Sequence, residues 1–73
     1  MQEVRLGDAG YPVLVLQSLL SLHSEIDVTG TFGEETLDIL CEYQARYAIV
    51  EGRGSATPET WSQLLLGNKD GVL

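Results

Sequence analysis

The sequence has few of the residues that form disulfide cross-links in a small protein or that bind nucleic acid. Its one cysteine, Cys41, cannot form an internal disulfide, so we expect it to behave as a small apolar residue on a helix face. Four basic residues stand against eleven acidic ones, and the net charge is −7. Because nucleic-acid affinity depends on Lys and Arg neutralising phosphates, no nucleic-acid partner is predicted, and docking on anionic lipid is disfavoured for the same reason.

A long apolar run is also missing. The longest, residues 11–22, is interrupted by Pro12, Gln17, Ser18 and Ser21. It falls short of the ~20 apolar residues that a membrane span needs. The N-terminus shows no basic region followed by an apolar run, so we expect no signal peptide and no membrane partner.

Catalytic and metal-binding groups are scarce. His23 is the single histidine, and no base is predicted near Cys41, so we predict no enzyme. We interpret His23 as a residue at a helix C-terminus, which the helix dipole favours. The spacing Asp27-x-Thr29-x-Thr31 is like the start of a calcium loop, but one carboxylate is too few and an aromatic residue follows where that loop needs glycine. We therefore predict no metal and no cofactor.

The 73 residues are enough for one domain, and an apolar content of 44% is typical of a globular one. Pro12 suits the first position of a helix, and the apolar spacing from Val13 to His23 predicts that helix. No charged residue lies between Pro12 and His23, so part of the helix exposes apolar side chains. We expect a partner interface formed by Leu14, Val15 and Leu22.

A glycine turn opens the second predicted helix. Gly30 and Gly33 bracket Phe32, which suits a sharp turn with one aromatic side chain held inward, and Val28 is expected to enter the core just before it. Carboxylates in the next two positions are favoured by the first turn of a helix. The helix is predicted to reach about Tyr47, because one face repeats at helical spacing. Its outer face carries an acidic row that we expect to be solvated: Glu34, Asp38 and Glu42.

The third predicted helix runs from Pro58 to about Leu66, with Thr57 as its N-cap and Gly67 as its stop. The apolar pair Ile49 and Val50 is expected to tuck inward before it. With an offset of 24 residues, the segment 30–37 matches the segment 54–61, each being a glycine turn that opens a helix. We therefore predict an all-α fold of three helices with two related turn–helix units. The predicted core is Val13, Leu16, Leu20, Phe32, Leu40, Tyr43, Trp61 and Leu64.

An ordered set of short motifs covers residues 4–67. The motifs are Leu6-Gly7-Asp8-x-Gly10, Val13-x-x-Leu16-Gln17-x-x-Leu20, Gly30-x-Phe32-Gly33-x-x-Thr36-x-x-Ile39-Leu40-x-x-Tyr43-Gln44, and Thr60-Trp61-x-x-Leu64. This set resembles the helical peptidoglycan-binding domain of the first type, a three-helix module attached to many bacterial cell-wall hydrolases. The resemblance implies a compact domain at residues 1–67, a tail at 68–73, and non-catalytic binding of peptidoglycan.

The loops depart from that family. Asp27-Val28-Thr29-Gly30 replaces the usual Asp-Gly before the aromatic turn, Thr57 stands where glycine is usual, and Glu51-Gly52-Arg53-Gly54 replaces the second Asp-Gly. Leu14 and Val15 occupy positions that are often charged or small. The altered loops and the charge-free first helix favour a second hypothesis, a protein-interaction or structural module that docks through this helix, or self-associates, within a larger and phage-type assembly.

Muropeptides offer N-acetyl groups, hydroxyls, amides and carboxylates, which suit a shallow groove with an aromatic wall and a few polar groups. The loops beside the two turn units supply such groups. The predicted ligand-binding residues are Asp27, Thr29, Thr31, Arg46, Tyr47, Arg53 and Ser55. Because the wall polymers are themselves largely anionic, an acidic chain would bind them by stereochemistry. With no signal peptide, we expect a protein that is cytoplasmic as synthesised and reaches the wall by lysis, particle assembly or non-standard export.

Overall fold

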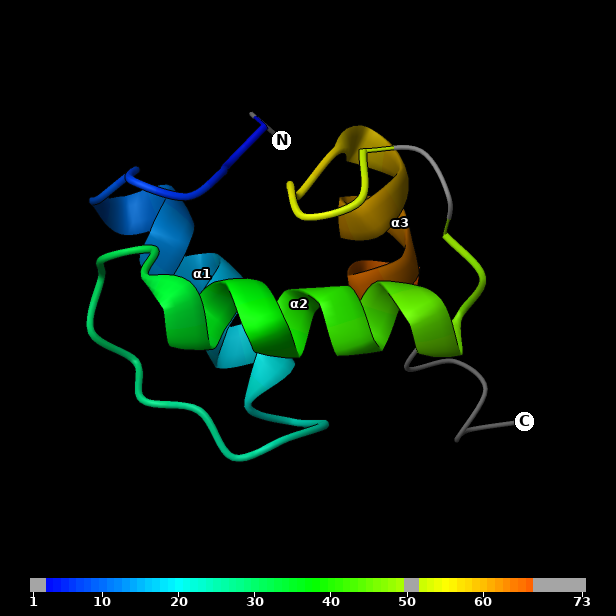
Figure 1. The fold of residues 1–73 in the computed structure, drawn as a ribbon, viewed down its shortest axis with the longest axis horizontal. Helices are drawn as coiled ribbons and strands as arrows, with labels where there is room; N and C mark the ends of the chain where they lie inside the picture. The colour runs from blue at the N-terminus through cyan, green and yellow to red at the C-terminus, as the bar shows by residue number, and fades with distance from the viewer. Residues whose placement is uncertain (1–2, 50–51, 67–73) are drawn as a thin grey trace.

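In the described part of the chain, three helices form the fold: α1 (Tyr11–Leu20), α2 (Glu34–Arg46) and α3 (Pro58–Leu66). The computed structural model describes residues 3–49 and 52–66. The long helix α2 spans the molecule, while α1 and α3 lie toward its opposite ends, and α1 contacts both other helices (Figure 1). Within the described ranges there is no strand, only two isolated antiparallel bridges. The predicted all-α, three-helix fold is confirmed.

The N-terminal segment, residues 4–10, joins the two turns that precede α2 and α3. Val4 exchanges two backbone hydrogen bonds with Ala56, at 3.3 and 2.7 Å. Further along, the N–H of Gly7 donates to the carbonyl of Phe32 at 3.0 Å. In Figure 1 this blue segment runs from the start of α1 toward the loop before α3. One short stretch of chain therefore fixes both turns relative to each other.

Helix α1 ends earlier than the sequence indicates. It closes at Leu20, and the prediction that it continues to His23 is wrong. The N–H groups of Leu22 and His23 donate to carbonyls three residues earlier, at 3.2 and 2.9 Å, so the chain tightens into a turn. The hydroxyl of Ser21 also donates to the carbonyl of Ser18 at 2.6 Å, which offers the backbone an alternative to the helical pattern.

The core lies between the three helices. Each of the eight side chains assigned to it from the sequence is at most 4% exposed, and Val4, Ile49 and Ala56 join them. Val28, expected inward, is instead 46% exposed, because Ile26 packs against the core from the same loop. Val50, the stop at Gly67 and the tail at 68–73 lie outside the described residues.

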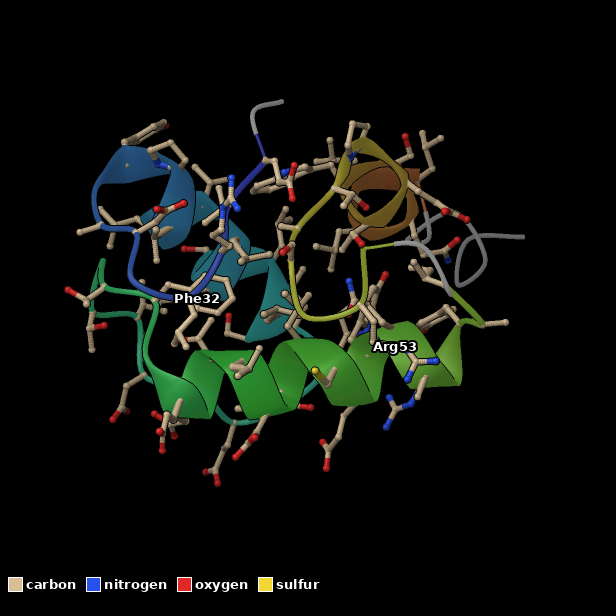
Figure 2. All side chains as sticks on the ribbon, turned by 45° about the horizontal axis from the view of Figure 1, so that its top comes forward. Phe32 and Arg53 are labelled. Carbon is tan, nitrogen blue, oxygen red and sulfur yellow. The ribbon has the colours of Figure 1, made fainter. Side chains whose placement is uncertain are left out.

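The outer face of α2 is acidic and solvated. Glu34, Asp38 and Glu42 are all exposed, as the sequence pattern predicts. Figure 2 shows side chains with oxygen tips projecting from the side of α2 opposite the other helices. In the part of the chain that the structure describes, no helix has both the length and the apolarity to cross a membrane.

Candidate ligand-binding surface

The first turn, residues 29–33, is held by the side-chain amide of Gln17, which is 1% exposed. The Oε1 of Gln17 accepts the N–H groups of Thr29 and Gly30, both at 2.9 Å. Its Nε2 donates to the carbonyl of Thr31 at 3.0 Å and to Oγ1 of Thr36 at 2.9 Å. One side chain of α1 therefore fixes both the turn and the start of α2.

The second turn, residues 52–55, is held in the same way by Gln44, which is fully buried. The Oε1 of Gln44 accepts the N–H of Gly54 at 2.8 Å. Its Nε2 donates to the carbonyl of Ser55 at 2.8 Å and to Oγ1 of Thr60 at 3.0 Å. The two threonines whose hydroxyls accept a hydrogen bond from a buried glutamine, Thr36 and Thr60, are separated by the 24-residue offset of the sequence repeat. The repeat is therefore a repeated hydrogen-bonding unit.

Each turn needs a glycine at its centre. Gly30 has φ of 86° and Gly54 has φ of 91°, both in the left-handed region. A Cβ built on Gly30 would lie 3.3 Å from Cδ2 of Leu14, and one on Gly54 would lie 3.4 Å from Cδ1 of Leu37. The turns therefore pack directly on leucine side chains of the helices.

The structure separates the predicted ligand-binding residues into groups. Asp27, Thr29 and Thr31 lie in the loop before α2, whereas Arg46 and Tyr47 lie at its other end. A helix of 13 residues is about 20 Å long at 1.5 Å per residue, so these two groups cannot meet on one small ligand. Figure 2 shows Phe32 at the start of α2 and Arg53 toward its far end.

Near the first turn, the predicted residues Asp27, Thr29 and Thr31 are all exposed. The hydroxyl of Thr29 serves the turn itself, since it accepts the N–H of Thr31 and donates to the carbonyl of Thr31, both at 3.2 Å. Thr31 also pairs with Ala9 in an antiparallel bridge. The rim of the first turn is therefore continuous with the N-terminal segment.

At the other end of α2, the predicted groups are partly used by the fold. Tyr47 packs against the ring of Tyr43, with centroids 4.6 Å apart. Arg53 is exposed, and its Nε donates to the carbonyl of Ile49 at 3.3 Å. Arg46 is exposed, and Ser55 is half-buried beside Gln44.

His23 does not have the role that the sequence suggests. It lies three residues beyond α1, and its ring packs against Tyr43 and Tyr47, with centroid distances of 5.1 and 6.2 Å. The interpretation as a helix C-terminal residue is therefore wrong, because the turn after Leu20 carries the ring to the end of α2.

A pocket of about 150 Å³ lies between the N-terminal segment and the start of α1. It is lined by Val4, Asp8, Ala9, Pro12 and Val13. Sequence reasoning did not identify it as a site, although Asp8 belongs to the motif Leu6-Gly7-Asp8-x-Gly10. Since Ala9 bridges to Thr31, the pocket and the rim of the first turn lie side by side.

The predicted partner interface on α1 is only partly at the surface. Leu14 is 37% exposed and Leu22 is 65% exposed. Val15 is half-buried and packs against the core. Leu22 lies past the end of α1, so these three side chains do not form one helical face.

The solved structures that resemble the chain include three crystal structures. An endolysin of the Burkholderia phage AP3 matches 90% of this chain with a TM-score of 0.83 and 36% identity. A peptidoglycan-binding protein from Clostridioides difficile, solved with glutamine hydroxamate, matches 86% with a TM-score of 0.80 and 26% identity. The SleB N-terminal domain matches 90% with a TM-score of 0.83 and 28% identity. The chain has a peptidoglycan-binding-like fold. No family model and no curated protein matches it.

The peptidoglycan-binding-like fold is one part of a larger protein in two of these neighbours. The chain spans 26% of the endolysin and 40% of the Clostridioides difficile protein, but 92% of the SleB N-terminal domain. These neighbours are consistent with a non-catalytic module. In residues 3–49 and 52–66, no three His, Cys, Asp or Glu side chains gather into a group that would hold a metal ion.

Proposed function

We propose that the chain is a non-catalytic module that binds the peptidoglycan of the bacterial cell wall and brings a lytic partner or a particle to it. The observation that carries this proposal is the likeness to solved structures over 90% of the chain, one of an endolysin and one of the SleB N-terminal domain, both with a TM-score of 0.83. A third neighbour is itself described as peptidoglycan-binding.

The rim of the first turn and the adjoining N-terminal segment are the surface that we assign to the muropeptide. Asp27 and Thr31 are exposed there, and the polar groups of the turn are fixed by Gln17. A fixed rim loses little conformational entropy on binding a ligand, which raises affinity without more contact area. Arg46, Tyr47, Arg53 and Ser55 are a second contact surface, reachable only by a ligand long enough to follow α2.

Charge predicts how this binding depends on salt. The chain carries a net charge of −7, and the wall polymers are largely anionic, so long-range electrostatics oppose association. At 0.1 M ionic strength, salt largely screens repulsion between charges that are more than about 10 Å apart. Binding should therefore persist or strengthen as salt rises, in contrast to adhesion of a basic protein.

A protein-docking function is the second candidate. It is favoured by the exposure of Leu14 and Leu22 and by the absence of charge between Pro12 and His23. In this case the chain would attach a larger assembly to a protein partner, or pair with a second copy, through α1.

Sedimentation with purified, insoluble peptidoglycan separates the two functions. Changes at the rim, Asp27→Ala or Thr31→Ala, should reduce the sedimented fraction, whereas the surface change Ser62→Ala on α3 serves as the control. Failure of the wild-type chain to sediment, together with dimerisation or partner capture that is lost in Leu14→Glu or Leu22→Glu, would refute peptidoglycan binding. If the wild-type chain sediments without self-association, and the changes at Asp27 or Thr31 abolish its sedimentation, docking through α1 is refuted.

A further inference from the structure

The pocket beside the first turn has both apolar and polar walls. Val4 and Val13 are each 1% exposed and form its floor with Pro12, while Asp8 and Ala9 contribute from the N-terminal segment. Its volume of about 150 Å³ suits one small chemical group of a larger ligand.

The backbone N–H and C=O of Ala9, which lines this pocket, are not used by the bridge to Thr31. Ala9 is the middle residue of an antiparallel bridge whose hydrogen bonds are made by its neighbours: Phe32 N–H donates to Asp8, and Gly10 N–H donates to Gly30, both at 2.9 Å. The N–H and C=O of the middle residue point away from the partner segment in such a pair. Among the residues that the structure describes, none forms a hydrogen bond with either group. A ligand is thus offered one donor and one acceptor in fixed positions.

Asp8 adds a second acceptor. Its Oδ2 accepts the N–H of Arg5 at 3.0 Å, which fixes the carboxylate, while no described donor reaches Oδ1. The bond to Arg5 restrains the side chain, so less conformational entropy is lost when a ligand binds.

We propose that this pocket recognises a secondary amide that carries a methyl group. The amide carbonyl of the ligand accepts the N–H of Ala9, its N–H donates to Oδ1 of Asp8, and its methyl group packs on Val4 and Pro12. Peptidoglycan presents this chemistry in two places, in the N-acetyl groups of its sugars and in the alanyl amides of its peptides. The assignment as a wall-binding subsite rests on the proposed function; the chemistry of the pocket does not.

Titration of the ¹⁵N-labelled chain tests the inference. The probes are an N-acetylglucosamine trimer, trialanine, and cellotriose, a glucose trimer that lacks the acetamido group. We expect saturable shifts at the amides of Asp8, Ala9 and Val13. Shifts with the acetylated trimer identify the sugar as the source, and shifts with trialanine alone identify the peptide. Equal shifts with cellotriose, or no shifts at these amides with any probe at millimolar concentration, would overturn the proposal.

Variants of the pocket provide the second test. Asp8→Asn keeps an acceptor for the Arg5 N–H but loses the charge, and should weaken binding about tenfold, as expected for loss of a charged hydrogen bond. Ala9→Leu, at an exposed position, should block the pocket and abolish the shifts. Asp38→Asn makes the same charge change on the solvated face of α2 and should leave affinity unchanged. The amide spectrum of each variant reports whether the fold is retained. Affinity within twofold of wild type for both pocket variants would contradict the assignment.

Sedimentation with peptidoglycan keeps the two proposals apart. If the wild-type chain sediments and Asp8→Asn sediments equally well, the subsite is wrong and the proposed function stands. If the wild-type chain does not sediment but the probes shift the pocket amides, the proposed function is wrong and the pocket chemistry stands.

Discussion

Replacing Gln17 by leucine should destabilise the fold far more than a typical substitution of a surface glutamine. The substitution keeps the side-chain size but removes the amide that satisfies four groups of the first turn and of α2, at 2.9, 2.9, 3.0 and 2.9 Å. A stranded buried polar group costs roughly 1–3 kcal/mol, and the low end applies here because the turn is partly open to water.

Four groups at about 1 kcal/mol each, offset by about 1 kcal/mol for the greater apolarity of leucine, predict a loss of roughly 3 kcal/mol. A domain of this size has a total stability of about 4–11 kcal/mol, so the loss is a large share of it. The corresponding fall in Tm is about 12–24 °C. Gln44→Leu should behave alike, because the amide of Gln44 makes the same kind of contacts in the second turn.

Thermal unfolding monitored by circular dichroism measures this effect. Gln63→Leu is the matched control, since Gln63 lies on α3 and its side chain has no hydrogen-bond partner among the described residues. We expect its Tm to stay within about 3 °C of wild type, as for a typical surface change. If Gln17→Leu and Gln44→Leu shift the Tm no more than Gln63→Leu does, the glutamines do not hold the turns and the account of the repeat is wrong.

Two further predictions concern the backbone. Gly52→Ala should lower the free energy of unfolding by about 2 kcal/mol or more, because Gly52 has φ of 69° and the added Cβ would collide with Cγ2 of Thr57. Gly7→Ala is the control, because Gly7 has φ of 97° but open space around it, and chemical denaturation should show a smaller loss of stability. Ala48→Gly should stabilise the chain by about 0.5–1 kcal/mol, because Ala48 has φ of 59° at the end of α2, where the N–H of Ile49 bonds to the carbonyl of Gln44 at 2.8 Å. Ala45→Gly inside α2 should show the opposite sign, and a stabilising Ala45→Gly or a destabilising Ala48→Gly would contradict this assignment.

Local patterns were sufficient to predict the helices and most of the core. Apolar residues at helical spacing, glycine turns and Pro58 place α2 and α3 close to their observed bounds. The end of α1 was not predictable in this way, because Leu22 extends the run of apolar residues while the N–H groups of Leu22 and His23 bond to carbonyls three residues earlier. Periodicity reports which face is apolar, but not which carbonyl each N–H selects.

The buried hydrogen bonds of the two glutamines could be identified only from the structure. Glutamine is usually found at the surface, so the sequence did not indicate that Gln17 and Gln44 are buried. The one feature that the two share is that each follows a residue of the predicted core. Their role depends on turns 13 and 10 residues further along the chain. The pocket at Asp8 and Ala9 depends likewise on long-range pairing with Phe32 and Gly30. By contrast, the predicted binding residues are all near the turns in sequence, yet the length of α2 separates them into two groups.

The central claim is that this fold binds peptidoglycan through stereospecific contacts. The most direct measurement is the isotherm for sedimentation of the wild-type chain with purified insoluble peptidoglycan, at low and high salt, with insoluble cellulose as the control. The account predicts saturable binding to peptidoglycan that is retained or strengthened at high salt, and none to cellulose. Absence of binding to peptidoglycan, equal binding to cellulose, or binding that disappears as salt rises would contradict it.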